Sequence, residues 1–215
     1  MQGDKAVIFD MDGVIVDSEP RHESAFLEVV REIGYGDTLR LDFADYVGKS
    51  DHELWVDFIA RHNPPQTLAQ LLEMKRSRIL EIIRREQPLF DGLPALIRRL
   101  AGRYHLGVAS GSERVVVDEV LRLERLCDCF KCVVTAGDVP RGKPAPDIFL
   151  RAAQLLGVHP ADCWVIEDSI PGISAGLAAG MCVIAITNTH PASELTRAHH
   201  VVGTYSEIEK LLLDG

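Results

Sequence analysis

Short apolar runs alternate with amphipathic stretches along most of this chain, and this alternation strongly constrains its fold. The runs cover residues 6–9, 106–109, 132–135, 163–166 and 182–186. They are rich in Val and Ile without polar alternation, which is typical of strands buried on both faces of a parallel sheet. Helices are predicted at residues 95–100, 115–123, 148–156 and 170–180. This order predicts an α/β fold with a doubly wound parallel sheet, a Rossmann-like core.

One interval departs from the alternation. A strand–helix–strand unit takes about 30 residues, whereas roughly three times that length separates the first two apolar runs. The interval has helical patterns at residues 23–33, 53–62 and 68–85 and lacks a good strand pattern. We therefore predict a helical domain over residues 18–87, inserted into an α/β core formed by residues 1–17 and 88–215. Pro88 and Gly92 punctuate the return to the core.

The charge and hydropathy of the chain limit the classes of partner that it can bind. The 215 residues carry a net charge of −9, which argues against nucleic acid or an anionic membrane, because both require a basic surface. The apolar runs fall short of the roughly 20 residues that span a bilayer. The first residues lack the basic, apolar and small-residue segments of a secretory signal. We therefore expect a cytoplasmic monomer that acts on a small molecule.

Three of the five cysteines, Cys127, Cys129 and Cys132, form a cluster that suggests zinc binding. A structural zinc site uses four ligands, and a fourth is not evident nearby in the sequence. The odd number of cysteines also argues against a disulfide framework. We therefore interpret the cluster as reduced thiols near the start of a strand.

Polar residues stand where the first two predicted strands end. Asp10 and Asp12 flank one residue after the first strand, and Gly13 permits a sharp turn behind them. Ser110 and Gly111 follow the second strand, where a hydroxyl and backbone N–H groups ahead of a helix can seat an anion. Each feature alone also fits ordinary turn or helix capping.

Two later segments add charges of both signs. Lys143 lies in a loop stiffened by Pro144 and Pro146, directly ahead of a predicted helix. Glu167 and Asp168 follow the fourth predicted strand, again at the start of a helix. Because ligands of such folds bind at the carboxyl ends of the strands, we expect all these side chains to share one pocket.

Four carboxylates in one pocket, from Asp10, Asp12, Glu167 and Asp168, would repel one another and raise one another's pKa values. A hard divalent cation with oxygen ligands resolves that conflict, and Mg²⁺ with a phosphate is the usual occupant. A cation, carboxylates, a hydroxyl and an ammonium around one point form a phosphoryl-transfer site. The sequence therefore predicts Mg²⁺ as cofactor and a phosphorylated small molecule as substrate.

The order of these segments, Asp-x-Asp-Gly, Ser, Lys-Pro and Glu-Asp, resembles the four motifs of the haloacid dehalogenase superfamily. The helical insertion after the first motif resembles the subgroup that carries an α-helical cap. Residues 9–14 and 142–147 are similar to the corresponding segments of β-phosphoglucomutases and sugar-phosphate phosphatases. The resemblance covers nearly the whole chain and implies a phosphotransferase with a cap over residues 18–87.

The resemblance also implies roles for the four acidic residues. Asp10 would be the nucleophile and a Mg²⁺ ligand. Asp12 would be the general acid and base, and its backbone carbonyl would also bind the metal. Asp168 would be a metal ligand, and Glu167 would bind the metal directly or through water.

The remaining motif residues would hold the transferred group. By the same resemblance, Ser110, Gly111 and Lys143 would bind the phosphoryl oxygens, and Lys143 would also serve in catalysis. The resemblance further implies a cis peptide bond between Lys143 and Pro144.

Two alternatives lie outside phosphate-ester chemistry. Dehalogenases of the superfamily lack the second carboxylate of the first motif, because a halide leaves without a proton, whereas Asp12 is present here. A non-enzymatic aspartyl-phosphate switch would resemble response-regulator receivers, which are about half this length and have no inserted cap. Both alternatives are disfavoured, and turnover on a phosphomonoester would separate an enzyme from a switch.

A phosphatase and a β-phosphoglucomutase-type mutase would share the same core and differ in the cap. His22, Lys49 and Lys75 stand where such mutases place groups that contact the sugar and the cap. The mutases carry an arginine that grips the second phosphate at the position of Asp51, which has the opposite charge. We therefore predict a Mg²⁺-dependent phosphatase for a small phosphorylated metabolite such as a sugar phosphate, with the mutase as the alternative.

Overall fold

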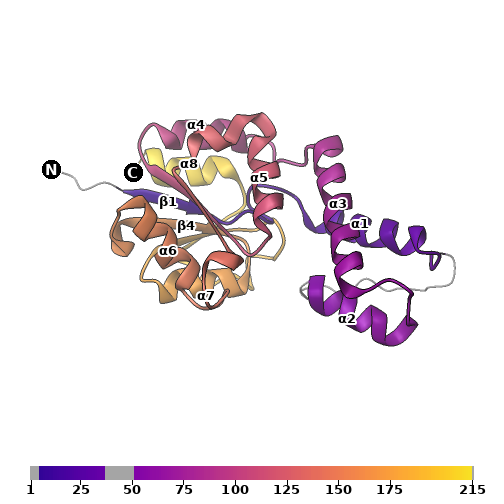
Figure 1. Ribbon diagram of the computed structural model, residues 1–215. Helices are drawn as coiled ribbons and strands as arrows, with labels where there is room; N and C mark the ends of the chain where they lie inside the picture. The colour runs from indigo at the N-terminus through magenta and orange to yellow at the C-terminus, as the bar shows by residue number, and fades with distance from the viewer. Residues whose placement is uncertain (1–4, 37–50, 215) are drawn as a thin grey trace. The chain divides into compact units, whose positions relative to one another are not determined.

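Within residues 5–36 and 51–214, which the computed structural model describes, six parallel strands form one sheet (Figure 1). Their order across the sheet is β3-β2-β1-β4-β5-β6. The strands are β1 (Ala6–Phe9), β2 (His105–Ser110), β3 (Cys132–Thr135), β4 (Cys163–Glu167), β5 (Cys182–Ile186) and β6 (His200–Val202). The first five were predicted, and the parallel sheet is confirmed.

Helices cover both faces of the sheet. Their bounds are α4 (Leu93–Ala101), α5 (Arg114–Arg122), α6 (Asp147–Leu156), α7 (Ile170–Ala178) and α8 (Tyr205–Leu213). Figure 1 shows α4, α5 and α8 on one face and α6 and α7 on the opposite face. This arrangement confirms the doubly wound prediction.

The direction of the winding reverses next to β1. From β1 the chain adds β2 and β3 towards one edge, then returns to place β4 on the other side of β1. Loops at the carboxyl ends of β1 and β4 therefore diverge to opposite faces and leave room for a ligand between them. Asp10 directly follows β1, and Glu167 ends β4.

The sheet is buried on both faces, as its composition predicts. All four side chains of β1 are 0% exposed, and β4 buries Val165 and Ile166 to the same extent. Helix α6 contributes Phe149 and Ala152 to the same core. Each large apolar side chain buried in this way stabilises the fold by about 1.5–3 kcal/mol. The strand ends that carry the polar motifs are thus anchored in a rigid core.

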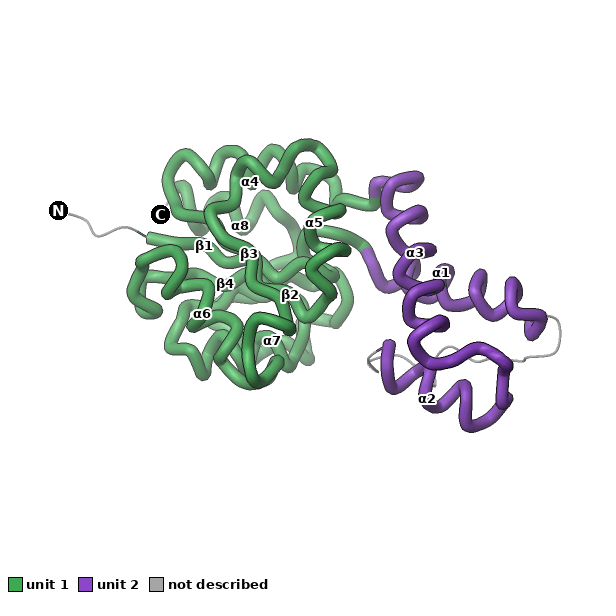
Figure 2. The backbone as a smooth tube through the Cα atoms, in the orientation of Figure 1, with its two compact units in different colours: residues 1–17, 88–215 green, residues 18–87 purple. Residues whose placement is uncertain are grey.

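A second compact unit is helical. One unit of the chain consists of Met1–Asp17 with Pro88–Gly215, and the other consists of Ser18–Gln87 (Figure 2). The helical unit contains α1 (Glu19–Glu32), α2 (Asp51–His62) and α3 (Leu68–Glu86). Its core centres on Phe26, Trp55 and Phe58, and the Phe26 and Trp55 ring centroids are 4.8 Å apart. This unit therefore has an apolar core of its own.

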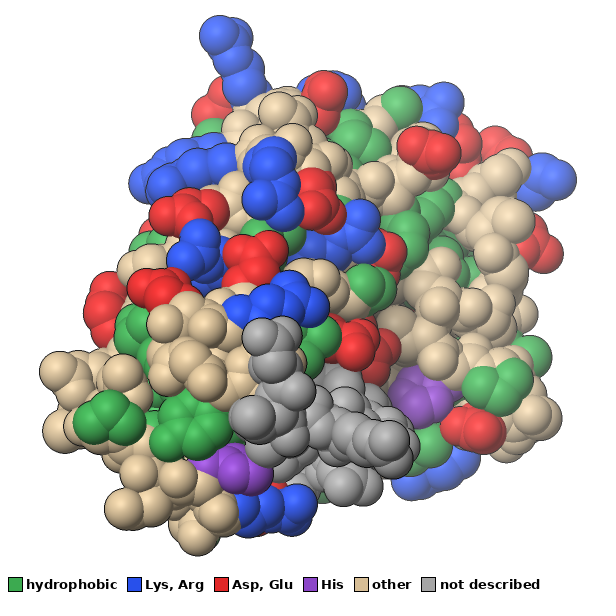
Figure 3. Space-filling view, turned by 90° about the vertical axis from the view of Figure 1, so that its right-hand side faces the viewer, with side chains coloured by type: hydrophobic (Ala, Val, Ile, Leu, Met, Phe, Trp, Pro, Cys, Tyr) green, Lys and Arg blue, Asp and Glu red, His purple; other side chains and the backbone are tan. Residues whose placement is uncertain are grey.

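Several of the described charged side chains on the helical unit are paired with one another. Arg78 of α3 contacts Glu28 and Glu32 of α1 at 3.3 and 2.9 Å and Glu81 of its own helix at 3.0 Å. The face in Figure 3 shows basic and acidic side chains interspersed. Exposed pairs of this kind each contribute little to stability, about 0–1 kcal/mol.

Two elements near the end of the chain were not predicted, namely β6 and α8. Strand β6 has three residues, so its apolar pattern is too short to identify. Helix α8 begins with a capping box in which Thr204 and Glu207 satisfy each other's backbone N–H groups. Among the described helices, none combines the length and the hydropathy needed to cross a membrane. All five cysteines are free thiols.

Candidate active site

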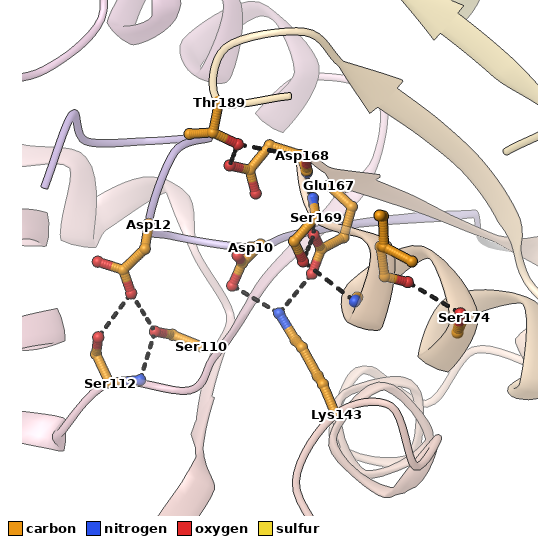
Figure 4. Close-up of polar contacts among 12 residues, drawn as sticks. Asp10, Asp12, Ser110, Ser112, Lys143, Glu167, Asp168, Ser169, Ser174 and Thr189 are labelled. Carbon is orange, nitrogen blue, oxygen red and sulfur yellow. Dashed lines mark hydrogen bonds and ion pairs between the residues drawn. The ribbon is translucent and has the colours of Figure 1, made fainter. Parts of the chain in front are cut away.

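Three predicted residues meet at the carboxyl edge of the sheet, where β1 and β4 lie side by side (Figure 4). Lys143, from the loop ahead of α6, places its Nζ 2.7 Å from Asp10 Oδ1 and 2.6 Å from Glu167 Oε1. Residues that are far apart in the sequence are thus brought into direct contact. The peptide bond between Lys143 and Pro144 is cis, which confirms that prediction.

Asp168 joins Asp10 and Glu167 in a buried acidic cluster. One carboxylate oxygen from each lies within 4.8 Å of the others, and the three residues are at most 6% exposed. Burial raises the pKa of Asp10 well above its usual range, an effect that Lys143 opposes and Glu167 reinforces. Burial also raises the pKa of Asp168 to about 6, with a further contribution from Glu167. The cluster therefore resists carrying its full negative charge alone.

Lys143 supplies a positive charge to this cluster. Burial by itself lowers the pKa of Lys143, but Asp10 and Glu167 more than reverse that effect and raise it. The ammonium is therefore charged at neutral pH. One ammonium faces three carboxylates, so the balance of charge remains negative.

The chemistry of the cluster fits a hard divalent cation. Its donors are carboxylate oxygens, which Mg²⁺ prefers over nitrogen or sulfur. A cation would also offset the charge that burial leaves uncompensated, because nearby opposite charge stabilises ionised carboxylates. Asp10, Glu167 and Asp168 are thus able to hold Mg²⁺.

Glu167 is held from several sides. Its Oε2 accepts hydrogen bonds from the backbone N–H groups of Asp168 and Ser169, both at 3.0 Å, and from the Ser169 hydroxyl at 2.9 Å. Its Oε1 contacts Lys143. A carboxylate at the start of α7 is also favoured by the helix dipole. Glu167 is therefore a fixed anchor, while Asp10 and Asp168 have fewer donors around them.

The anchor depends on the absence of a side chain at Gly172. A Cβ at this position would lie 1.7 Å from Glu167 Oε1 and 2.3 Å from Oε2. Replacing Gly172 with alanine must therefore displace the carboxylate from Lys143 and Ser169. We expect Gly172→Ala to lower the free energy of unfolding by about 1–3 kcal/mol, the usual cost of overpacking.

Urea denaturation measures this change, and Gly102→Ala is the matched control. A Cβ at Gly102 would lie 3.4 Å from the Arg99 carbonyl oxygen, an ordinary contact. The control should be as stable as the parent or more stable by up to about 1 kcal/mol, because Gly102 has helical backbone angles and alanine restricts the unfolded chain. Equal stabilities for Gly172→Ala and the parent would show that the Glu167 anchor is dispensable.

Asp12 lies beside the acidic cluster but points to the end of β2 (Figure 4). Its Oδ2 accepts a hydrogen bond from the Ser112 hydroxyl at 2.6 Å, and the Ser110 hydroxyl lies 3.4 Å away. The Ser110 oxygen in turn accepts from the Ser112 backbone N–H at 3.0 Å. Gly111, between the two serines, is exposed. The structure thus directs the Asp12 carboxylate to the serines at the end of β2, whereas the carboxylates of Asp10, Glu167 and Asp168 lie together.

The helical unit brings together two of its three candidate residues. Lys75 of α3 is 2% exposed, and its ammonium forms an ion pair with Asp51 and lies 3.4 Å from His22 Nδ1. Lys49 lies outside the described residues. Asp51, which stands where the mutases carry an arginine, is thus paired with a cation of its own unit.

Two residues at the site were missed by sequence reasoning. Ser112 contacts Asp12, and its hydroxyl within Ser110-Gly111-Ser112 was a signal that could have indicated it. Thr189 contacts Asp168 from the loop after β5, and its hydroxyl donates to Asp168 Oδ2 at 2.5 Å. Thr189 carries no recognisable motif, so only the fold identifies it.

A family model for haloacid dehalogenase-like hydrolases matches residues 5–180. The chain belongs to this family. Fructose-1-phosphate phosphatase YqaB from Escherichia coli K12 is 34% identical over 187 residues, which cover 84% of this chain and 95% of that protein. Beta-phosphoglucomutase from Bacillus subtilis 168 is 32% identical over 196 residues, which cover 87% of this chain and 85% of that protein.

The fold of this haloacid dehalogenase-like hydrolase also occurs in solved structures. CbbY from Rhodobacter sphaeroides, crystallised as a complex with xylulose-(1,5)bisphosphate, superposes with a TM-score of 0.81. The match covers 95% of this chain and 96% of that one at 24% sequence identity. Identity at this level establishes the shared fold alone. The family match and the phosphatase among the relatives together support a phosphoric monoester hydrolase.

Proposed function

We propose that this hydrolase is a Mg²⁺-dependent phosphatase that hydrolyses a small sugar phosphate through an aspartyl-phosphate at Asp10. The observation that carries the proposal is the buried contact of Lys143 with Asp10 and Glu167, 2.7 and 2.6 Å away. This contact places a permanent cation beside a carboxylate that follows a central strand. Such a pair suits attack on phosphorus, since the ammonium can also balance charge on the phosphoryl oxygens.

In the proposed first step, a carboxylate oxygen of Asp10 attacks the phosphorus, and the bond from phosphorus to the sugar oxygen breaks. Protonated Asp12 gives its proton to the leaving alkoxide. In the second step, ionised Asp12 takes a proton from water, whose oxygen attacks the phosphorus. The Asp10–phosphorus bond then breaks and releases inorganic phosphate. A covalent intermediate divides one difficult displacement into two easier ones.

The remaining residues serve charge balance and orientation. Bound Mg²⁺ would neutralise negative charge on the phosphoryl oxygens. Its candidate side-chain ligands are Asp10 and Asp168, with Glu167 beside them. The backbone carbonyl of Asp12 is a further candidate ligand. Ser110 and the Gly111 backbone would hold the phosphoryl group at the end of β2. Ser112 would keep the Asp12 carboxylate directed to this end of the sheet, through its 2.6 Å hydrogen bond.

We further propose that the helical unit of residues 18–87 is a cap that selects the substrate. His22 and Lys49 are its candidate contact residues. Lys75 is the third, although its burial and its ion pair with Asp51 favour a role in holding α3 to the start of α2. Loss of Asp51 would be costly, because it would leave the buried Lys75 ammonium without a compensating carboxylate.

A mutase is the second candidate, because a β-phosphoglucomutase is among the relatives. A mutase must bind a bisphosphorylated intermediate, which requires a second anion site. Such a site is well served by a guanidinium, which grips phosphate through two parallel hydrogen bonds. This chain has Asp51 at the corresponding position, already paired with Lys75. Because residue 51 is an aspartate and not an arginine, we favour the phosphatase over the mutase.

We expect the purified protein with Mg²⁺ to release inorganic phosphate from sugar phosphates, including fructose 1-phosphate. With β-glucose 1-phosphate and catalytic β-glucose 1,6-bisphosphate, phosphate release should exceed formation of glucose 6-phosphate. A molybdate assay measures the phosphate, and a coupled dehydrogenase assay measures glucose 6-phosphate in the same sample. A mutase would show the reverse order, with glucose 6-phosphate accumulating far faster than phosphate. Failure to turn over any phosphomonoester would favour a non-enzymatic switch.

A further inference from the structure

The loop that follows β5 lies outside the four sequence motifs, yet it contacts the acidic cluster. Thr189 is exposed to solvent, yet its hydroxyl is directed at Asp168 (Figure 4). The hydroxyl donates to Asp168 Oδ2 at 2.5 Å and lies 3.4 Å from the Asp168 backbone oxygen. One of the two carboxylate oxygens of Asp168 is therefore engaged by a neutral donor.

Thr189 and Asp168 also close around Gly13, in the turn that follows the proposed nucleophile and acid. A Cβ on Gly13 would lie 1.9 Å from Asp168 Oδ2 and 2.9 Å from Thr189 Cγ2. The φ of Gly13 is +73°, a conformation that favours glycine. The missing side chain of Gly13 therefore leaves the space that the Asp168 carboxylate and the Thr189 methyl group occupy.

Neighbours of Thr189 secure the loop to the same turn. Asn188 Nδ2 donates to the Gly13 carbonyl oxygen at 2.7 Å and contacts the Tyr205 phenolic oxygen at 2.9 Å. The Tyr205 hydroxyl, from the start of α8, donates to the Val14 carbonyl oxygen at 2.7 Å. These hydrogen bonds attach the residue before Thr189 to the turn that contains Gly13 and Val14.

We propose that Thr189 is a positioning residue that fixes the Asp168 carboxylate for cation binding. A hydrogen bond to one oxygen restricts rotation of the carboxylate, so the other oxygen keeps a constant direction. Groups that orient metal ligands in this way typically change metal affinity by about 10–100-fold when removed. The inference rests on the proposed function only in that Asp168 is taken as a Mg²⁺ ligand.

We expect Thr189→Val to weaken Mg²⁺ binding about tenfold, the lower end of the range for such orienting groups. Valine keeps the shape of threonine and removes the hydroxyl, and Thr189→Ser restores the hydroxyl without the methyl group. Titration calorimetry with MgCl₂ measures the affinity without any turnover. Thr189→Ser should bind Mg²⁺ nearly as the parent does, and Thr189→Val should regain phosphatase activity as Mg²⁺ is raised.

Equal Mg²⁺ affinity in Thr189→Val and the parent would overturn the inference. Circular dichroism and thermal melting without Mg²⁺ check the fold, and Thr189→Ala provides a second variant without the hydroxyl if valine perturbs folding. The Mg²⁺ affinity of these variants is measured without turnover, so its outcome is independent of the proposed phosphatase activity. A parent that binds Mg²⁺ through a Thr189-dependent site but hydrolyses no phosphomonoester would refute the function and leave the positioning role intact.

Discussion

Replacing Asp10 with asparagine is expected to abolish turnover while preserving the fold. The amide is nearly isosteric with the carboxylate but is a poor nucleophile, so the covalent route is lost. General acid–base groups contribute about 10²–10⁴-fold, and we expect loss of the nucleophile to exceed about 10⁴-fold. Asp10→Asn should be as stable as the parent or more stable, because Asp10 is one of three buried carboxylates that repel one another. Lys143 also keeps its contact with Glu167 at 2.6 Å in this variant.

Two measurements check this expectation. Phosphate release under saturating substrate and Mg²⁺ gives the rate, and thermal melting reports the fold. Acid quenching with radiolabelled substrate should trap label on the parent and none on Asp10→Asn. Parent-like rates in Asp10→Asn would mean that water attacks the substrate directly, and the two-step mechanism would have to be abandoned.

Removing Mg²⁺ is expected to abolish phosphatase activity as completely as Asp10→Asn does. One ammonium, from Lys143, faces the carboxylates of Asp10, Glu167 and Asp168 within the buried cluster. Without a divalent cation this cluster repels a phosphate dianion, because like charges in a poorly solvated site interact strongly. We expect excess EDTA to eliminate phosphate release, and added Mg²⁺ to restore it.

Asp168→Ala tests the same cluster by mutation. We expect Asp168→Ala to weaken Mg²⁺ binding by more than about 100-fold. This exceeds the loss that is typical when a residue that only orients a metal ligand is removed. Asp162→Ala is the matched control, because Asp162 is exposed and precedes β4, at the opposite end of that strand from Asp168. Titration calorimetry and phosphate release apply to both variants. Full activity in excess chelator, or unchanged Mg²⁺ affinity in Asp168→Ala, would contradict a metal-dependent mechanism.

The strands and helices of the core were predictable because their signals are local. Unbroken runs of Val and Ile identify strands buried on both faces, and each run ends close to the polar residues that the structure places at the carboxyl edge. Asp10, Lys143 and Glu167 were assigned to one pocket because parallel strands bring their carboxyl ends to the same edge. Their contacts in the structure follow from this topology.

Other features depend on tertiary contacts that leave no local pattern. The pairing of Lys75 with Asp51 joins two helices of the helical unit, and either residue alone resembles an exposed charge on a helix. Strand β6 is three residues long and is defined by its hydrogen bonds to β5 rather than by its own periodicity.

The order of residues along the chain was enough to indicate the chemistry, because carboxylates, a lysine and a serine at successive strand ends leave few alternatives to phosphoryl transfer with a cation. How those groups are arranged became visible only in three dimensions. The fold directs the Asp12 carboxylate to Ser112 and away from the acidic cluster, and it holds Asp168 through Thr189. The physical reason is that side-chain direction and hydrogen-bond partners depend on neighbours from distant segments, which a linear motif does not contain.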